Sequence, residues 1–303
     1  MTASAAVEHR VTLADGRLVS YAESGDPEGV PVVHAHGVLG CRLEIAAPAI
    51  DLAARRLGVR LLAPDRPGIG LSDPKPGRSV LDWPVDLLGF AEAVGISRFS
   101  LIGWGGASPF VLASALRIAH RLRAVGIVSG VASPDRAVVT GGGAGEGLRR
   151  LSARYAPWWL RRWVRAVSSA MVSDPDRTID RLLGSIDEAD RAVVRDADWR
   201  EHHRAVLREA FRRGPEGATE DLLAVYRDWG FQPSQVPMVV NLWFGPAGTA
   251  GGGAGLWLSR ALERSEARVS GHGGSHSFLA NRYEELLHGL LVTADREEGR
   301  PVG

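Results

Sequence analysis

Apolar residues along this chain fall into short runs that alternate with longer stretches of helical period. The short runs occupy residues 30–37, 59–65, 99–104 and 122–130. The helical stretches occupy residues 43–58, 79–95 and 106–120. Nearly continuous apolar runs are typical of strands buried on both faces of a parallel sheet, with helices as the covering layers. The alternation predicts an α/β protein with a doubly wound, mostly parallel sheet.

The two ends and the middle of the chain depart from this alternation. Residues 11–24 favour a hairpin that turns at Asp15 and Gly16. Residues 135–232 are rich in Arg and Trp and have helical period without buried strands. The earlier alternation then resumes with a strand, helix, strand and helix at residues 236–245, 255–265, 267–271 and 277–291. We therefore expect a core of residues 1–134 and 233–303, with a helical lid at 135–232.

Composition narrows the function classes. The formal net charge is +1, which gives no electrostatic basis for binding nucleic acid. No apolar run is long enough to span a bilayer, and the first residues do not resemble a secretory signal, so a cytoplasmic protein is expected. Cys41 is the only cysteine, which excludes an intrachain disulfide. The oligomeric state is not indicated.

Two glycine-rich stretches, at 141–147 and 248–255, raise the question of a phosphate site. Neither carries the GK[ST] signature, and neither follows a βαβ unit with the acidic residue that dinucleotide sites need. Flexible loops are the better interpretation, and no cofactor is expected.

Four short segments carry a family resemblance. They are HGVLGCR at 36–42, DRPGIGLS at 65–72, GWGGA at 103–107 and WGF at 229–231. Together they resemble the α/β-hydrolase superfamily, in particular a bacterial branch with a lid, and the likeness covers nearly the whole chain. The resemblance implies the α/β-hydrolase fold, a helical lid over a mostly apolar pocket, and acyl or related chemistry on small molecules.

The catalytic positions of that family are altered here. Its triad runs Ser, then Asp or Glu, then His. The serine position holds Gly105, and the acid position after the seventh strand holds Gly248. Only His276, in the segment GGSHSFL, matches. Serine hydrolysis needs a side-chain oxygen that gives its proton to a histidine, so ordinary hydrolysis is not expected.

Replacement residues for the missing triad members are weak candidates. Ser108 lies one helical turn beyond the elbow and fits a helix cap better than a nucleophile. Cys41 lies in the loop after a strand, where a lone thiol is more often inert packing. Asp135, just after the strand at 122–130, can substitute for the acid, although a surface aspartate at the lid entrance is the simpler interpretation.

The remaining groups suit proton transfer beside a carbonyl. The resemblance implies an oxyanion hole made by the backbone N–H groups of Val38 and Gly106, which needs no side chain. A glycine at position 105 also adopts the elbow's positive φ without strain. With His276 as general acid or base, such a site supports cyclisation, lyase or isomerase chemistry without a covalent nucleophile. His272 is a weaker candidate, and a metal site is not expected because no third ligand accompanies the two histidines.

Aromatic residues of the lid suggest the kind of ligand. The expected pocket residues, beside the catalytic positions, are His36, Gly37, Cys41, Trp104, Trp158, Trp159 and Tyr226. Within the resemblance, His36 shapes the oxyanion loop rather than titrating. Large flat side chains suit an apolar, polycyclic or polyketide-like compound. The basic, Trp-bearing lid also permits binding to a membrane surface, although a solvated helix face is the simpler interpretation.

Three functions are therefore open. The first is a non-hydrolytic enzyme that acts on an apolar carbonyl compound, in keeping with bacterial secondary metabolism. The second is a ligand-binding pseudo-hydrolase that serves as a receptor or accessory protein. The third is a hydrolase with an unusual nucleophile or an activated water.

Overall fold

The computed structural model describes residues 6–134, 144–183, 186, 188–247, 249, 251–271 and 274–299. Three residues singled out above, Asp135, Gly248 and His272, lie outside this part of the chain. Their proposed roles stay predictions from sequence.

The core is one eight-stranded sheet in the order β1-β2-β4-β3-β5-β6-β7-β8. The strands are β1 (Val7–Thr12), β2 (Leu18–Gly25), β3 (Val30–Ala35), β4 (Val59–Pro64), β5 (Phe99–Trp104), β6 (Leu122–Val128), β7 (Val240–Phe244) and β8 (Ser265–Val269). The pairs β1–β2 and β2–β4 are antiparallel, and the other neighbours are parallel. The predicted doubly wound, mostly parallel sheet is confirmed.

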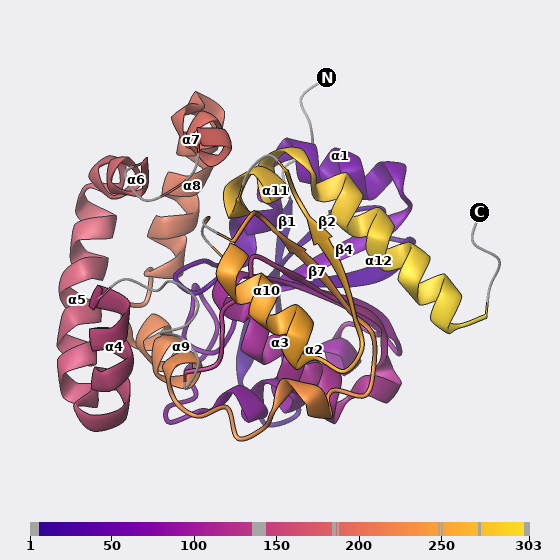
Figure 1. Ribbon diagram of the computed structural model, residues 1–303, viewed down its shortest axis with the longest axis horizontal. Helices are drawn as coiled ribbons and strands as arrows, with labels where there is room; N and C mark the ends of the chain where they lie inside the picture. Colours follow the sequence, from indigo (N-terminus) through magenta and orange to yellow (C-terminus); the bar gives the residue numbers. More distant parts are fainter. Residues whose placement is uncertain are drawn as a thin grey trace.

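Helices cover both faces of the sheet (Figure 1). One face carries α1 (Pro48–Arg56), α11 (Ser275–Asn281) and α12 (Tyr283–Glu297), and the other carries α2 (Trp83–Ala93), α3 (Ser108–Arg117) and α10 (Gly252–Ala261). Each face buries its own apolar cluster, and the inner strands contribute to both. This arrangement explains why the inner strands are apolar at successive positions rather than at alternate ones.

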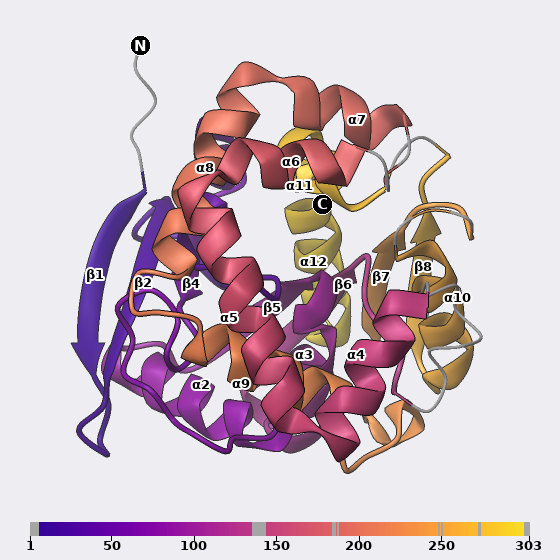
Figure 2. The same ribbon diagram turned by 90° about the vertical axis from the view of Figure 1, so that its left-hand side faces the viewer.

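Six α-helices of the described residues lie between β6 and β7 and are called the lid below. They are α4 (Ala144–Tyr155), α5 (Pro157–Ser173), α6 (Pro175–Leu183), α7 (Glu188–Arg195), α8 (Ala197–Ala210) and α9 (Glu216–Tyr226). Figure 2 faces the lid and shows α5 and α4 in front of the sheet. None of the helices in the described ranges is long and apolar enough to span a membrane.

Three stretches differ from the sequence prediction. The stretch 43–58 is divided into a short 3-10 helix, η1 (Arg42–Ala46), and α1, because Pro48 begins a new helix. The last helical stretch is also two helices, which meet at Arg282. The second glycine-rich stretch is partly helical, since α10 starts at Gly252 and packs closely on the residues before it.

Candidate active site

The end of β5 carries the elbow that the motif predicted. Trp104 ends the strand, and Gly105 begins a short 3-10 turn, η3 (Gly105–Ala107), that leads into α3. Gly105 has a φ of +55°, in the left-handed region that glycine adopts without steric cost. A Cβ atom placed on it would meet no atom within 4 Å. The apex of the elbow therefore faces open space and offers no nucleophile.

The two alternative nucleophiles are buried in structural roles. The Ser108 hydroxyl oxygen accepts a hydrogen bond of 2.9 Å from the Val131 amide, just beyond β6. Cys41 is fully buried in a cluster with lid residues, and its sulfur lies 3.5 Å from the Val206 carbonyl oxygen. Burial, reinforced by the nearby Asp65 carboxylate, raises the pKa of the Cys41 thiol well above its usual value. Neither residue has the properties of an activated nucleophile.

The loop after β3 lies against the elbow. A Cβ atom on Gly106 would lie 2.4 Å from Cγ2 and 3.6 Å from the amide nitrogen of Val38. The two segments whose amides were expected to form the oxyanion hole are therefore side by side.

His36 holds this loop in place as a neutral imidazole. Its Nε2 accepts a hydrogen bond of 3.0 Å from the Arg66 amide, so the proton lies on Nδ1, which donates to the Gly37 carbonyl at 2.9 Å. Burial, together with the Arg66 guanidinium, lowers the pKa of His36 well below its usual value. His36 thus acts as a fixed hydrogen-bonding group beneath the loop.

A second buried group, Glu44 of η1, fixes the same loop from the other side. Its carboxylate accepts from the Gly37 amide at 3.0 and 3.1 Å. It also lies 2.8 Å from His34 Nε2, and His34 Nδ1 lies 3.0 Å from the Tyr283 hydroxyl. Burial, with Glu44 nearby, raises the pKa of Tyr283, so the phenol keeps its proton in this hydrogen bond. The series of hydrogen bonds from Tyr283 through His34 and Glu44 to Gly37 links α12, β3 and η1 to the loop after β3.

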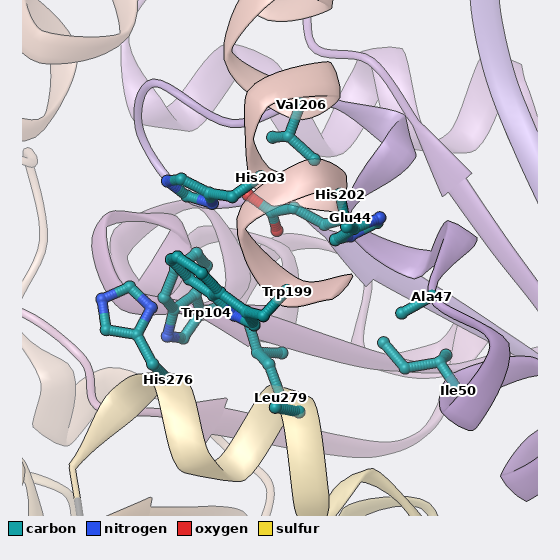
Figure 3. Close-up of a pocket in the computed structure, with 11 residues that line it drawn as sticks. Glu44, Ala47, Ile50, Trp104, Trp199, His202, His203, Val206, His276 and Leu279 are labelled. Atoms are coloured by element: carbon teal, nitrogen blue, oxygen red, sulfur yellow. The ribbon is translucent and has the colours of Figure 1, made fainter. Parts of the chain in front are cut away.

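A small cavity opens between the core and the lid beside the elbow (Figure 3). Its volume is about 40 Å³. The lining residues come from η1, α1, β5, α8 and α11, and they are Glu44, Ala47, Ile50, Trp104, Trp199, His202, His203, Val206, His276, Leu279 and Ala280. Such a volume accommodates a few water molecules or a small ligand.

His276 lies at the edge of this cavity, at the start of α11, and is 8% exposed. Its ring meets Trp104 and Trp199 edge to face, with 5.3 Å between ring centroids in each pair. The ring of His203, in the lid, stacks on Trp199 at 4.4 Å and lies 6.3 Å from His276. The lid therefore brings a second imidazole to the predicted histidine.

The cavity is lined by two lid histidines with lowered pKa values and by a tryptophan N–H without a hydrogen-bond partner. Burial, with help from His276 and His202, lowers the pKa of His203 to about 3, so this imidazole is neutral at physiological pH. Burial also lowers the pKa of His202. Among the described residues, the buried Trp104 Nε1–H has no hydrogen-bond partner. It is available to donate to an oxygen atom of a ligand or a water molecule.

Asp190 of lid helix α7 holds the start of α11. Its side chain is fully buried, and Oδ1 accepts a hydrogen bond of 2.8 Å from the Ser277 amide. An anionic acceptor suits the positive end of a helix. The residue next to His276 is thus fixed by the lid.

The base of the lid is also fixed to the loop after β3. Arg66 donates from Nε to Asp221 of α9 at 2.8 Å, and from its two terminal nitrogens to the carbonyls of His36 and Gly37 at 2.6 and 3.0 Å. Arg78 binds the other oxygen of Asp221 at 2.6 Å. Although burial opposes ionisation, these guanidinium groups lower the pKa of Asp221.

The sequence identified only part of this cavity. Of the residues expected in a pocket, Trp104 and His276 line this cavity, and His36, Gly37, Cys41, Trp159 and Tyr226 do not. Trp158 is 68% exposed at the start of α5 and does not line this cavity. The cavity is also smaller than the pockets that hold drug-sized ligands, which have volumes of roughly 300–1,000 Å³.

Four polar or aromatic residues of the cavity were missed by the sequence analysis, namely Glu44, Trp199, His202 and His203. The spacing of Trp199 and His203 places both on one helix face, which was a usable signal. Nothing in the spacing indicates that this face meets His276. In the described ranges, no three His, Cys, Asp or Glu side chains are arranged to hold a metal ion.

Comparisons with known proteins bear on the fold. No family model and no curated protein matches the sequence. Among solved structures, a hydrolase from Pseudomonas aeruginosa PA01 aligns with a TM-score of 0.66 and 16% identity, over 94% of this chain and 98% of that one. The enol-lactonase from Burkholderia xenovorans LB400 aligns with a TM-score of 0.66 and 17% identity, over 93% and 99%.

An α/β-hydrolase fold protein from Chitinophaga pinensis aligns with a TM-score of 0.64 and 19% identity, over 98% of both chains. At these identities the likeness shows the fold alone. The chain therefore has the α/β-hydrolase fold.

Proposed function

We propose that this chain is an enzyme that uses the α/β-hydrolase scaffold for proton transfer in a small carbonyl compound, without a covalent nucleophile. Cyclisation, lyase and isomerase reactions belong to this class. The observation that carries the proposal is the cavity in which His276 meets Trp104, one residue from an elbow apex that has no side chain. The site keeps a histidine, His276, while the nucleophile position, Gly105, has no side chain.

The residues take distinct roles in this proposal. His276 accepts or donates the proton beside the carbonyl group, as a general base or acid. The amides of Val38 and Gly106 stabilise the negative charge that develops on the oxygen, at typically ~3 kcal/mol per donor in a dry site. Trp104 Nε1–H and the neutral His203 orient the ligand. The small cavity replaces the earlier expectation of a polycyclic substrate with a compact one.

The first experiment asks whether the elbow and His276 still form a working pair. We expect wild type to be inert to a fluorophosphonate probe, and Gly105→Ser to be labelled in a reaction that needs His276. A serine fits sterically at this position, although its positive φ costs roughly 1–2 kcal/mol of stability. The matched control is Gly105→Ser combined with His276→Ala, which should lose the label.

Labelling of wild type would contradict the proposal and favour hydrolysis by another nucleophile. Cys41→Ala then tests whether the thiol is that nucleophile.

The second experiment tests proton transfer directly. Small ketones and 1,3-dicarbonyl compounds are incubated with the protein in D₂O, and loss of the proton beside the carbonyl is followed by NMR. We expect wild type to accelerate exchange and His276→Ala to lose most of that acceleration, since general acid–base catalysis contributes typically ~10²–10⁴-fold. Binding of these compounds without exchange would instead favour the ligand-binding function.

A further inference from the structure

Exposed apolar side chains are concentrated on one part of the lid. Scattered exposed apolar residues are normal in proteins, but a cluster of them indicates an interaction surface. Five large ones lie on α4 and α5, with exposed fractions of 52, 57, 68, 68 and 40% for Leu148, Leu151, Tyr155, Trp158 and Val172. The other exposed large apolar residues of the described chain lie one each on β1, α1, α2, α10 and β8.

The first four of these residues lie close together in the sequence, within residues 148–158. Leu148, Leu151 and Tyr155 are spaced three and four residues apart, which places them on one face of α4. Trp158 follows at the first turn of α5. Both helices lie at the front of the view in Figure 2, on the outer side of the lid.

The same segment is strongly basic. Residues 147–173 contain six arginines and no Asp or Glu. Arg161 and Arg165 pair with Glu220 and Glu216 of α9. Within the described residues, Arg154 and Arg162 are exposed and pair with no carboxylate, and the Arg154 guanidinium lies over the Tyr155 ring at 5.3 Å. Cationic groups therefore flank the apolar residues.

We propose that the outer face of α4 and α5 docks on an anionic phospholipid surface. Interfacial helices combine Leu and Trp, which enter the acyl boundary, with Arg and Lys, which attract anionic headgroups. Charge complementarity selects this partner over a second copy of the chain. In a two-fold symmetric dimer the same face meets itself, and the unpaired arginines of both copies would repel one another.

Vesicle co-sedimentation of the full chain tests the proposal. Vesicles of phosphatidylcholine alone are compared with vesicles that also contain phosphatidylglycerol. We expect binding to the anionic vesicles, weaker binding to neutral ones, and loss of binding as salt rises. Arg154→Gln combined with Arg162→Gln should lower the partition coefficient on anionic vesicles about 30-fold, from ~1 kcal/mol for each arginine near the surface.

The apolar contribution needs its own variant and control. Leu151→Ser combined with Trp158→Ser should weaken binding to both kinds of vesicle. Leu52→Ser combined with Val85→Ser, which removes residues 48% and 67% exposed on α1 and α2, should leave binding unchanged. Thermal unfolding checks that each variant is folded.

Three results would overturn the proposal. The first is that wild type does not sediment with anionic vesicles. The second is that the α4–α5 apolar variant binds as tightly as the control. The third is a dimer of wild type, detected by sedimentation velocity, that does not bind vesicles and is abolished by the α4–α5 apolar variant. A second copy of the chain would then cover the face.

Discussion

At the residue scale, the site depends on close approaches that leave no room for a side chain. A Cβ atom on Gly40 would lie 1.7 Å from Glu44 Oε1, so any larger residue must displace that carboxylate. The carboxylate is the acceptor for the Gly37 amide and lies beside His34, both of which are buried. The glycine therefore leaves room for the hydrogen bonds that shape the loop after β3.

Gly40→Ala tests this dependence. We expect a loss of about 1–3 kcal/mol in the free energy of unfolding, because a buried carboxylate and its donors lose their geometry. Urea unfolding measures the change. Gly147→Ala on α4 is the matched control, since a Cβ atom there meets nothing within 4 Å. Equal stability of the two variants would show that Glu44 moves without cost.

At the scale of elements, two lid helices, α7 and α8, contact the segment that carries His276. The α7 carboxylate of Asp190 accepts from the α11 amide of Ser277, and α8 places Trp199 and His203 over the imidazole. The histidine is therefore positioned by the lid as much as by the sheet.

Asp190→Ala should disturb this arrangement. Loss of a buried acceptor leaves the Ser277 amide without its partner, at a cost of about 1–3 kcal/mol in unfolding free energy. The ring signals of His276 in an NMR spectrum should shift as α11 relaxes. The control is Glu188→Ala on the same helix, whose ion pairs with Arg191 and Arg195 are exposed and contribute little. Unchanged His276 signals in Asp190→Ala would remove this positioning role.

Local sequence patterns predict the sheet and part of the site, but they do not predict contacts between distant segments. The periodicity of β3, β4, β5 and β6 is local information, and it predicted the sheet. Trp104 and His276 were identified because they lie in recognisable segments. Glu44 and His203 were missed because their roles arise from contacts between segments 159 residues apart, which no local pattern encodes. Trp158 was assigned to the pocket because composition does not reveal which helix face is solvated.

At the scale of the whole molecule, closure of the lid on the core makes stability depend on pH. His203 has a pKa of about 3 in the folded protein and an ordinary value of 6.5, so the unfolded chain binds more protons between these values. Stability contributed by the neutral imidazole is present above pH 6.5 and is lost progressively as the pH falls below it.

His203→Gln should therefore flatten the acid side of the stability profile. The measurement is the urea midpoint of wild type and variant as the pH is lowered from neutral. We expect the wild-type midpoint to fall faster than that of the variant, since glutamine does not titrate. Parallel curves for the two proteins would mean that lid closure does not exclude the charged imidazole.

The Arg66 guanidinium has a consequence for chimeric proteins. This one side chain binds the lid through Asp221 and the loop after β3 through the His36 and Gly37 carbonyls. A lid transplanted from another protein of this fold would have to supply an acid at the position of Asp221. Without it, Arg66 and Arg78 would be buried beside each other with no counter-charge, a situation that costs several kcal/mol. The lid of this chain can therefore be exchanged only for one that keeps an acidic partner for the buried Arg66.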